Sequence, residues 1–180
     1  AQTPVRLSFS SIRTQEELID KLTAPLEMSA EELRTLLRDS VYCDSLGFTT
    51  ETIRCMFLPD THEVYWNVSP KELLHKYEQS YHKFWNQKRT ALAQEIGLTP
   101  VEVSIIASIV EEESSKTDEY GDIAGLYINR LRKGMALQAD PTLKFATGNF
   151  TAQRIGGELL KADSPYNTYK YKGLPPGPIR

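Results

Sequence analysis

The stretch Val-Ser-Ile-Ile-Ala-Ser-Ile-Val-Glu-Glu-Glu-Ser-Ser, residues 103–115, joins an apolar helix to three consecutive carboxylates. At about 100° per residue, the apolar side chains form one stripe along the helix. Glu113 follows this stripe at helical spacing, whereas Glu112 lies at its edge and Glu111 lies on the polar side. One carboxylate of the three, Glu113, is therefore predicted to point toward the interior or a cleft. The residues of the stripe are Ile105, Ile106, Ile109 and Val110.

Two interpretations of Glu113 remain open from this segment alone. Desolvation disfavours the charged form of a carboxyl group and raises its pKa, which lets a carboxylic acid donate a proton near neutral pH. Alternatively, the three glutamates are only a solvated helix end. Negative charge at a helix C-terminus opposes the macrodipole, so that end would carry a local cost.

Composition places the chain among soluble globular proteins. The 180 residues suffice for one domain, or one domain and a fragment. With 40% hydrophobic and 25% charged residues, disorder is not expected. The net charge of −3 and the lack of a basic run argue against nucleic acid as a partner. No apolar run reaches the roughly 18 residues of a membrane span, and no signal peptide opens the chain. A chain whose leader or anchor had been removed would look the same.

Cysteine and histidine offer little to a metal or redox site. Cys43 and Cys55 permit one disulfide, but because neither lies in a disulfide-dense pattern we expect them to be unpaired. His75 and His82 could share a helix face, yet two histidines without a carboxylate at ligand spacing are weak evidence for a metal site. We expect no metal and no cofactor.

Helix starts are the clearest structural signal. Ser or Thr is followed three residues later by Glu at 14, 29, 69 and 99, the spacing of a capping box. Glycine and proline positions mark further boundaries. Strand signals are scarce. The class predicted is α+β, mainly helical, with minor strands over 5–10 and 61–66 and with helices over 15–23, 30–39, 70–96, 100–114, 119–132 and from about 151.

The strand at Val5–Ser10 lies at the extreme N-terminus. A strand needs a neighbour for its backbone hydrogen bonds, and the rest of the chain offers few strands. We therefore expect this segment to be the edge of a neighbouring domain that the chain lacks.

The C-terminal half is rich in polar turn residues, within 134–142, 163–169 and 173–179. Amide, hydroxyl and aromatic groups on loops are suited to binding sugars, and loops on a rigid scaffold often carry function. Ordinary turn chemistry explains the same composition, and both explanations stay open here.

Five motifs follow one another along the chain. They are Ala107-Ser-Ile-Val-Glu-Glu-Glu113, Ala124-Gly-Leu-Tyr-Ile-Asn-Arg-Leu131, Gly134-Met-Ala-Leu-Gln-Ala-Asp-Pro-Thr142, Ser164-Pro-Tyr-Asn-Thr-Tyr169 and Gly173-Leu-Pro-Pro-Gly-Pro-Ile179. In this order they resemble the MltG/YceG-like endolytic murein transglycosylases. The resemblance is dense from about residue 55 to 180 and thin before that.

The resemblance implies an enzyme that cuts peptidoglycan glycan strands internally. It would cleave the MurNAc–GlcNAc β-1,4 bond without water, leave a 1,6-anhydroMurNAc end, and so terminate or trim nascent strands. Its catalytic residue would be Glu113, the second Glu of the family's Glu-x-Glu motif, in a lysozyme-like site with a single glutamate. The family hydroxyl that follows is kept as Ser114. Sugar-positioning roles would fall to Asn129, Gln138, Asp140, Thr142, Tyr166, Asn167 and Thr168.

The resemblance also implies an organisation and a location. Residues 1–12 would be a remnant of an N-terminal LysM-like domain, and 13–180 the catalytic domain, which in the family continues beyond Arg180. The full-length protein would be held by an N-terminal transmembrane anchor at the extracytoplasmic, periplasmic face, with cell-wall synthases as partners. Two competing functions remain: a lysozyme-type hydrolase with Asp140 as second carboxylate, and a non-catalytic glycan-binding domain.

Overall fold

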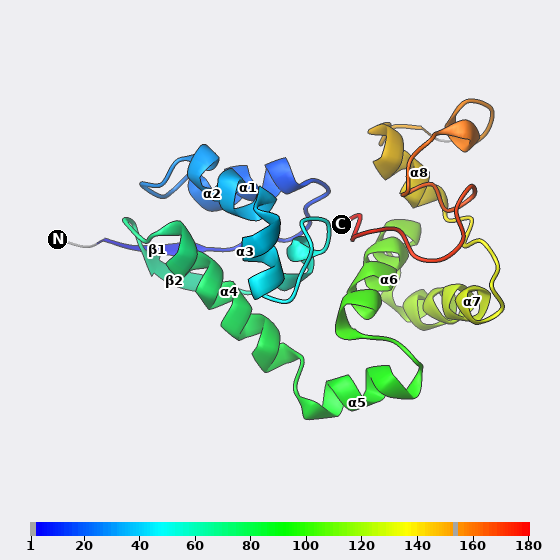
Figure 1. Ribbon diagram of the computed structural model, residues 1–180, viewed down its shortest axis with the longest axis horizontal. Helices are drawn as coiled ribbons and strands as arrows, with labels where there is room; N and C mark the ends of the chain where they lie inside the picture. Colours follow the sequence, from blue (N-terminus) through cyan, green and yellow to red (C-terminus); the bar gives the residue numbers. More distant parts are fainter. Residues whose placement is uncertain (1–2, 153–154) are drawn as a thin grey trace. The chain divides into compact units, whose positions relative to one another are not determined.

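The computed structural model describes residues 3–152 and 155–180, and the chain divides into two compact units, Ala1–Gly97 and Leu98–Arg180 (Figure 1). The architecture is mainly helical with one small sheet, which confirms the predicted class. In chain order the elements are β1 (Pro4–Leu7), α1 (Gln15–Thr23), α2 (Ala30–Arg38), α3 (Ser40–Ser45), η1 (Ile53–Met56), β2 (His62–Tyr65), α4 (Pro70–Phe84), α5 (Gln87–Glu95), α6 (Pro100–Glu113), η2 (Thr117–Glu119), α7 (Tyr120–Arg132), α8 (Asp140–Thr147) and η3 (Leu159–Lys161).

The N-terminal strand has a partner, contrary to our expectation. β1 pairs antiparallel with β2, with Val5 opposite Val64 and Leu7 opposite His62. Leu7 and Val64 are buried, so the sheet covers part of the core of the first unit. In the sequence, the boundary between the two compact units falls between residues 97 and 98. A division at residue 12 between a LysM-like remnant and a catalytic domain stays a prediction.

Capping side chains start the helices where the sequence predicts them. Ser29 and Glu32 form a complete capping box at α2, with both hydrogen bonds at 3.1 Å. Thr99 and Glu102 form another at α6. At α1 and α4 the Thr or Ser hydroxyl accepts the backbone N–H three residues later without the reciprocal bond. These contacts satisfy N–H groups that a helix start would otherwise leave open.

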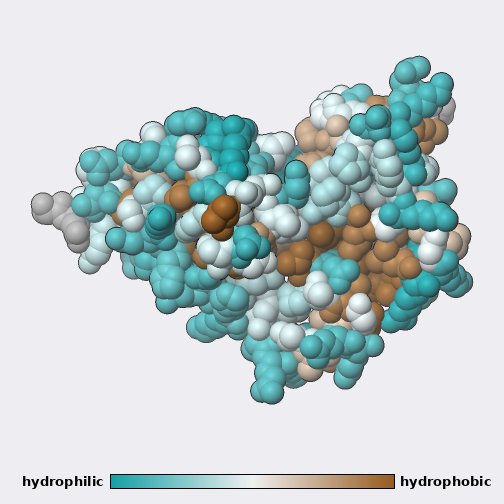
Figure 2. Space-filling model, viewed as in Figure 1, coloured by the Kyte–Doolittle hydropathy of each residue, from teal (hydrophilic) through white to brown (hydrophobic). Residues whose placement is uncertain are grey.

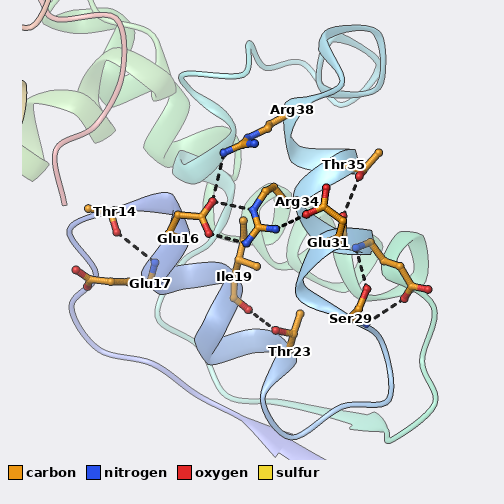
Figure 3. A network of polar contacts seen from close by, with 11 residues as sticks. Thr14, Glu16, Glu17, Ile19, Thr23, Ser29, Glu31, Arg34, Thr35 and Arg38 are labelled. Carbon is orange, nitrogen blue, oxygen red and sulfur yellow. Dashed lines mark hydrogen bonds and ion pairs between the residues drawn. The ribbon is translucent and has the colours of Figure 1, made fainter.

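A charged network links the first two helices (Figure 3). The Arg34 guanidinium on α2 pairs with Glu16 on α1 at 2.7 Å and with Glu31 on its own helix. Arg38 pairs with Glu16 at 3.4 Å. The hydrogen bond from Arg34 lowers the pKa of the Glu16 carboxyl. Because Glu16 is exposed, the network contributes little free energy and mainly fixes how α1 and α2 are aligned.

The helix predicted over 70–96 is two helices. α4 ends at Phe84, and Asn86 caps the start of α5 by accepting the Arg89 N–H at 2.9 Å. Apolar residues recur at three- and four-residue steps across 70–96, but Leu92 and Ile96, which lie beyond α4, are 53% and 38% exposed. Asn is among the strongest N-cap residues, and its hydrogen bond accounts for the break.

The second unit is built around α6. Its stripe residues are buried, and Ile109 is fully inaccessible. Ile106, Ile109 and Val110 pack with α7 and α8 and with Ile179 of the C-terminal segment, which returns beside α6 (Figure 1). The Ile179 N–H donates to the buried Ser108 hydroxyl at 3.0 Å, so the segment is held by a buried hydrogen bond as well as by packing.

Two further sequence expectations need comment. The short helix expected from about residue 151 is not found in the part of the chain that the structure describes: Thr151 lies in a turn, and the next helical residues are those of η3. Residues 153 and 154 lie outside the described residues. No single helix in the described ranges is long and apolar enough to cross a membrane. The pair α5 and α6 meets the length and composition test only when the two helices are counted together across the break.

Candidate functional site

Glu113 is the last residue of α6 and its side chain is exposed. The predicted direction is right in one respect, because Glu113 continues the side of the helix that carries Ile106 and Ile109. The predicted burial is wrong. The helix ends at Glu113 and Ser114 is already extended, so α6 does not continue past the carboxylate. The least exposed carboxylate of the three belongs to Glu112, at 18%. Desolvation therefore gives no support for a catalytic role of Glu113.

A buried tyrosine holds the Glu113 carboxylate instead. The Tyr127 hydroxyl, on α7, donates to Glu113 Oε1 at 2.5 Å. Tyr127 is 5% exposed and belongs to the hydrophobic cluster of the second unit. Burial, and next the bond to Glu113, raise the pKa of the Tyr127 phenol. Tyr127 therefore stays a proton donor over the working pH range and fixes one oxygen of the carboxylate.

A second carboxylate–tyrosine pair joins the start of α8 to the loop of residues 163–171. Asp140 opens α8, which sequence reasoning had treated as a loop although Pro141 stands in the first turn. The Tyr169 hydroxyl donates to Asp140 Oδ1. Burial and then this hydrogen bond raise the pKa of Tyr169 to about 12. A negative charge at the start of a helix is stabilised by the helix dipole, so a carboxylate is favourable at the position of Asp140.

The two pairs share one electrostatic environment. The charge of Asp140 acts on Tyr127 as well as on Tyr169, and the charge of Glu113 likewise acts on both phenols. The Arg130 cation opposes these effects at Tyr169. Glu113 and Asp140, which are 27 positions apart in the sequence, are therefore brought to one region of the second unit. This is the candidate active site.

Gln138 occupies a strained backbone position beside this region. Its φ is +50°, in the left-handed region that non-glycine residues rarely adopt. The Gln138 N–H donates to the Thr168 carbonyl at 3.2 Å, which holds the strained residue in place. Its side chain is exposed. Strain of this kind often accompanies function, and the exposed amide is available to a ligand.

Thr142 and Thr168 are buried rather than presented to solvent, which corrects the expectation that their hydroxyls line a binding surface. Thr142 is 0% and Thr168 is 1% exposed. Thr168 Oγ1 accepts the Ala139 N–H at 2.9 Å, and Thr142 Oγ1 donates to the Ala139 carbonyl at 2.6 Å. The two hydroxyl oxygens are 2.8 Å apart. These residues therefore lock the start of α8 to the 163–171 loop, behind Gln138 and Asp140.

Asn167 and Tyr166 have a similar structural place. Asn167 is 0% exposed, and its Nδ2 donates to the carbonyls of Leu160 and Ala162 at 3.1 and 2.8 Å. Its Oδ1 accepts the backbone N–H groups of Tyr169 and Lys170. Tyr166 is 9% exposed and packs on Phe145 of α8. A direct sugar contact through Asn167 is therefore not supported by its burial. Its contacts fix the loop that carries Tyr169.

Asn129 lies two residues after Tyr127 on α7. Residues two apart on a helix point about 200° away from each other, so the exposed Asn129 faces away from the side that holds Glu113. A role in sugar binding stays a prediction for Asn129. Within residues 3–152 and 155–180, no group of three or more His, Cys, Asp or Glu side chains could hold a metal ion, and Cys43 and Cys55 form no disulfide.

A sequence profile of the YceG-like family matches residues 1–180. The chain belongs to the YceG-like family. A Bacillus subtilis (strain 168) protein named endolytic murein transglycosylase is 47% identical over 74 residues, which are 41% of this chain and 20% of that protein. A Streptococcus pneumoniae serotype 2 protein of the same name is 41% identical over 86 residues, 46% of this chain and 16% of that protein.

The matched stretches thus span a fifth or less of these curated relatives. A solved structure of a yceG-like protein from Listeria monocytogenes is also similar, with a TM-score of 0.78 and 24% identity. It covers 98% of this chain and 62% of that one, and at this identity it supports the fold alone.

Two residues of the candidate site, Tyr127 and Tyr169, were not assigned a role from the sequence. A signal for Tyr127 was present, because it falls among the apolar residues of α7. A tyrosine on a buried helix face usually brings its hydroxyl to a polar partner. The identity of that partner was not readable, since Glu113 lies on a different helix.

Proposed function

We propose that the chain carries the catalytic site of an endolytic peptidoglycan lytic transglycosylase. The bond cleaved would be the MurNAc–GlcNAc β-1,4 linkage, and the product end a 1,6-anhydroMurNAc. Family membership and the names of the relatives support this activity. The observation that carries the assignment to a residue is the contact between Tyr127 and Glu113, which leaves the carboxylate solvent-accessible yet held by a buried donor.

One carboxyl group suffices for this chemistry. Glu113 as an acid protonates the glycosidic oxygen while the bond from C1 of MurNAc to that oxygen breaks. Glu113 as a carboxylate then takes the proton from the MurNAc 6-hydroxyl, whose oxygen forms the new bond to C1. The proton count closes, because Glu113 ends protonated as it began. No water and no cofactor is consumed, and the role of a second carboxylate in ordinary glycosidases is not needed.

A hydrolase is the second candidate, because the structure brings Asp140 into the same electrostatic region as Glu113. In a hydrolase the second carboxylate activates water or forms a covalent intermediate. The hydrogen bond that Tyr169 donates to Asp140 disfavours this role, because it occupies one carboxylate oxygen and lowers its nucleophilicity. The product separates the two: an anhydro end for a transglycosylase and a reducing end for a hydrolase.

The test compares single Glu-to-Gln variants on purified sacculi, with released muropeptides identified by mass. Glu113→Gln keeps size but cannot transfer a proton. Loss of general acid–base transfer costs roughly 10²–10⁴-fold in rate, and because one residue serves both steps we expect the upper part of that range. Glu111→Gln is the matched control and should stay close to wild type, since Glu111 lies on the far side of the helix.

If Glu113→Gln stays within about tenfold of the wild-type rate, the catalytic residue is misassigned. Glycan binding without turnover by the wild-type chain would favour a non-catalytic domain instead. Reducing ends as the main product would transfer the assignment to a hydrolase.

The setting follows from the substrate. Peptidoglycan lies outside the cytoplasmic membrane, so we propose an extracytoplasmic location, with the chain anchored in the full-length protein and acting on nascent strands near cell-wall synthases. Co-purification of the full-length protein with the membrane fraction, and loss of that association on deleting an N-terminal anchor, would support the location.

A further inference from the structure

The C-terminal segment places an arginine on the acidic end of α6. Arg180 Nε lies 3.4 Å from Glu111 Oε2, and Arg180 Nη1 lies 3.3 Å from Glu112 Oε1. The same Nη1 donates to the Glu111 backbone carbonyl at 3.4 Å. The Arg180 side chain is 28% exposed, so these contacts are partly shielded from water. The residue before it is anchored through the bond from the Ile179 N–H to Ser108.

The contacts answer an electrostatic problem created by the sequence. Three consecutive carboxylates end a helix whose C-terminus is already the negative end of the dipole. Negative charges on three consecutive side chains also repel one another. The Arg180 guanidinium forms ion pairs with Glu111 and Glu112 and donates a hydrogen bond to the Glu111 carbonyl in the last helical turn.

We propose that Arg180 is a positioning residue for Glu113 that acts through Glu111 and Glu112. By neutralising these two neighbours and binding the last turn of α6, Arg180 sets the pH range over which Glu113 exchanges its proton. This inference rests on the proposed function, and it adds a residue that neither the sequence motifs nor the tyrosine contacts identify.

Other charged and titratable groups face Glu113 and must be kept constant in a test. From α7 there is Tyr127, which is bonded to Glu113. From α8 and the 163–171 loop there are Asp140 and Tyr169, and Arg130 opposes them at Tyr169. Next in the chain, Ser114 donates to Glu119, which also pairs with Lys116. None of these groups is altered by a change at Arg180.

The experiment is a double-mutant cycle read out as pH–rate profiles on soluble glycan strands. Glu113 must begin protonated, so activity falls on the alkaline limb as Glu113 loses its proton. Arg180→Met removes the charge and keeps much of the volume. It should move the alkaline limb to higher pH by about half a unit, within the scatter that folded proteins impose on carboxyl groups. Arg180→Lys keeps the charge and should restore most of the wild-type position.

The second background is the variant Glu111→Gln/Glu112→Gln. If Arg180 acts through the two glutamates, Arg180→Met should move the alkaline limb by much less in this background, because the coupling is lost with its partners. An equal shift in both backgrounds, or no shift in either, would overturn the proposal. Thermal unfolding of each variant across the same pH range shows whether a lost rate or a moved limb comes from lost structure.

The outcome for Glu113→Gln stays separate from this result. An active Glu113→Gln variant contradicts the proposed function itself. A dead Glu113→Gln variant together with an Arg180 cycle that shows no coupling contradicts only the role of Arg180.

Discussion

The Glu113 carboxylate is held in place by one hydroxyl group, that of Tyr127, rather than by burial. The carboxylate is exposed, and the buried Tyr127 holds one of its oxygens at 2.5 Å. A hydrogen bond donated to a carboxylate favours the charged form and fixes the side chain in one orientation. Both effects can be removed without changing the packing, because phenylalanine fills the same volume.

Tyr127→Phe should lower kcat by roughly 10- to 150-fold, the loss expected when a hydrogen bond to a charged group worth roughly 1.5–3 kcal/mol is removed. Tyr171→Phe is the matched control. It removes a hydroxyl that binds Asp163 at 2.9 Å and should leave kcat unchanged. A Tyr127→Phe variant with the wild-type kcat would show that the contact is only structural.

Gln138 has an unusual backbone conformation for a residue with a side chain. At a φ of +50° a side chain costs roughly 1–2 kcal/mol. Gln138→Gly should therefore raise the free energy of unfolding, by somewhat less than that amount because glycine also gains freedom when unfolded. Activity should fall, since the exposed amide is lost. Gln138→Asn tolerates the same backbone and keeps an amide, so it should retain more activity. Denaturant unfolding and glycan cleavage measure the two effects, and a Gly variant as active as wild type would exclude a role for the amide.

At the level of elements, helix starts were predicted correctly where a capping residue was the clear local signal. They were not predicted where an apolar repeat or turn residues indicated something else. Capping residues gave the starts of α1, α2, α4 and α6, because a cap is a contact between residues three apart. The break between α4 and α5 was not predicted, because apolar residues recur at helical spacing on both sides of the N-cap residue Asn86. The helix α8 was missed because its polar first turn matched turn chemistry equally well, although Pro141 was a usable signal.

The loop of residues 163–171 shows why site residues could be named but not assigned their roles. The sequence pointed to Asn167 and Thr168 as polar groups on a loop. Whether a polar side chain turns outward to a ligand or inward to the backbone depends on contacts with distant residues, such as the bond from Ala139 to Thr168. A single sequence holds no record of that choice.

Asn167→Ala should destabilise the second unit by about 2–3 kcal/mol, because it leaves buried backbone groups of the loop without partners. Cleavage should also fall in the fraction that remains folded, because the loop carries the Tyr169 that binds Asp140. Asn149→Ala removes an exposed amide and serves as the control. Urea unfolding gives the stability. A change below about 0.5 kcal/mol would mean that water replaces these hydrogen bonds.

At the scale of the whole molecule, the sequence predicted the class but not the pairing of distant segments. The strand β1 pairs with β2 across four intervening elements, and pairing at such a separation leaves no local pattern in the sequence. The same holds for the C-terminal segment, where Ile179 binds Ser108 on α6. The long apolar stripe of α6 did identify the centre of the second unit, because burial on one face of a helix is periodic in the sequence.

Some hydrophobic side chains are exposed on the surface as well as buried in the cores. On the face drawn in Figure 2, hydrophobic side chains gather in the region of α6 and α7. Leu126 on α7 is 55% exposed, whereas Ile109 on α6 is fully buried. The two residues thus provide a matched pair for one substitution within one unit, and this pair tests whether the stripe of α6 is the core on which Glu113 depends.

Ile109→Asp should unfold the second unit, because it places a charge in a fully buried apolar position without a partner. Leu126→Asp should cost less than about 0.5 kcal/mol, as exposed substitutions usually do. Hydrogen exchange followed by mass spectrometry should show lost protection in α6, α7 and α8 and retained protection in α1 to α4, since each compact unit has its own buried residues. If Ile109→Asp keeps normal protection in α6, Ile109 does not lie in the core of the second unit. The orientation of α6 that brings Glu113 to Tyr127 would then be wrong as well.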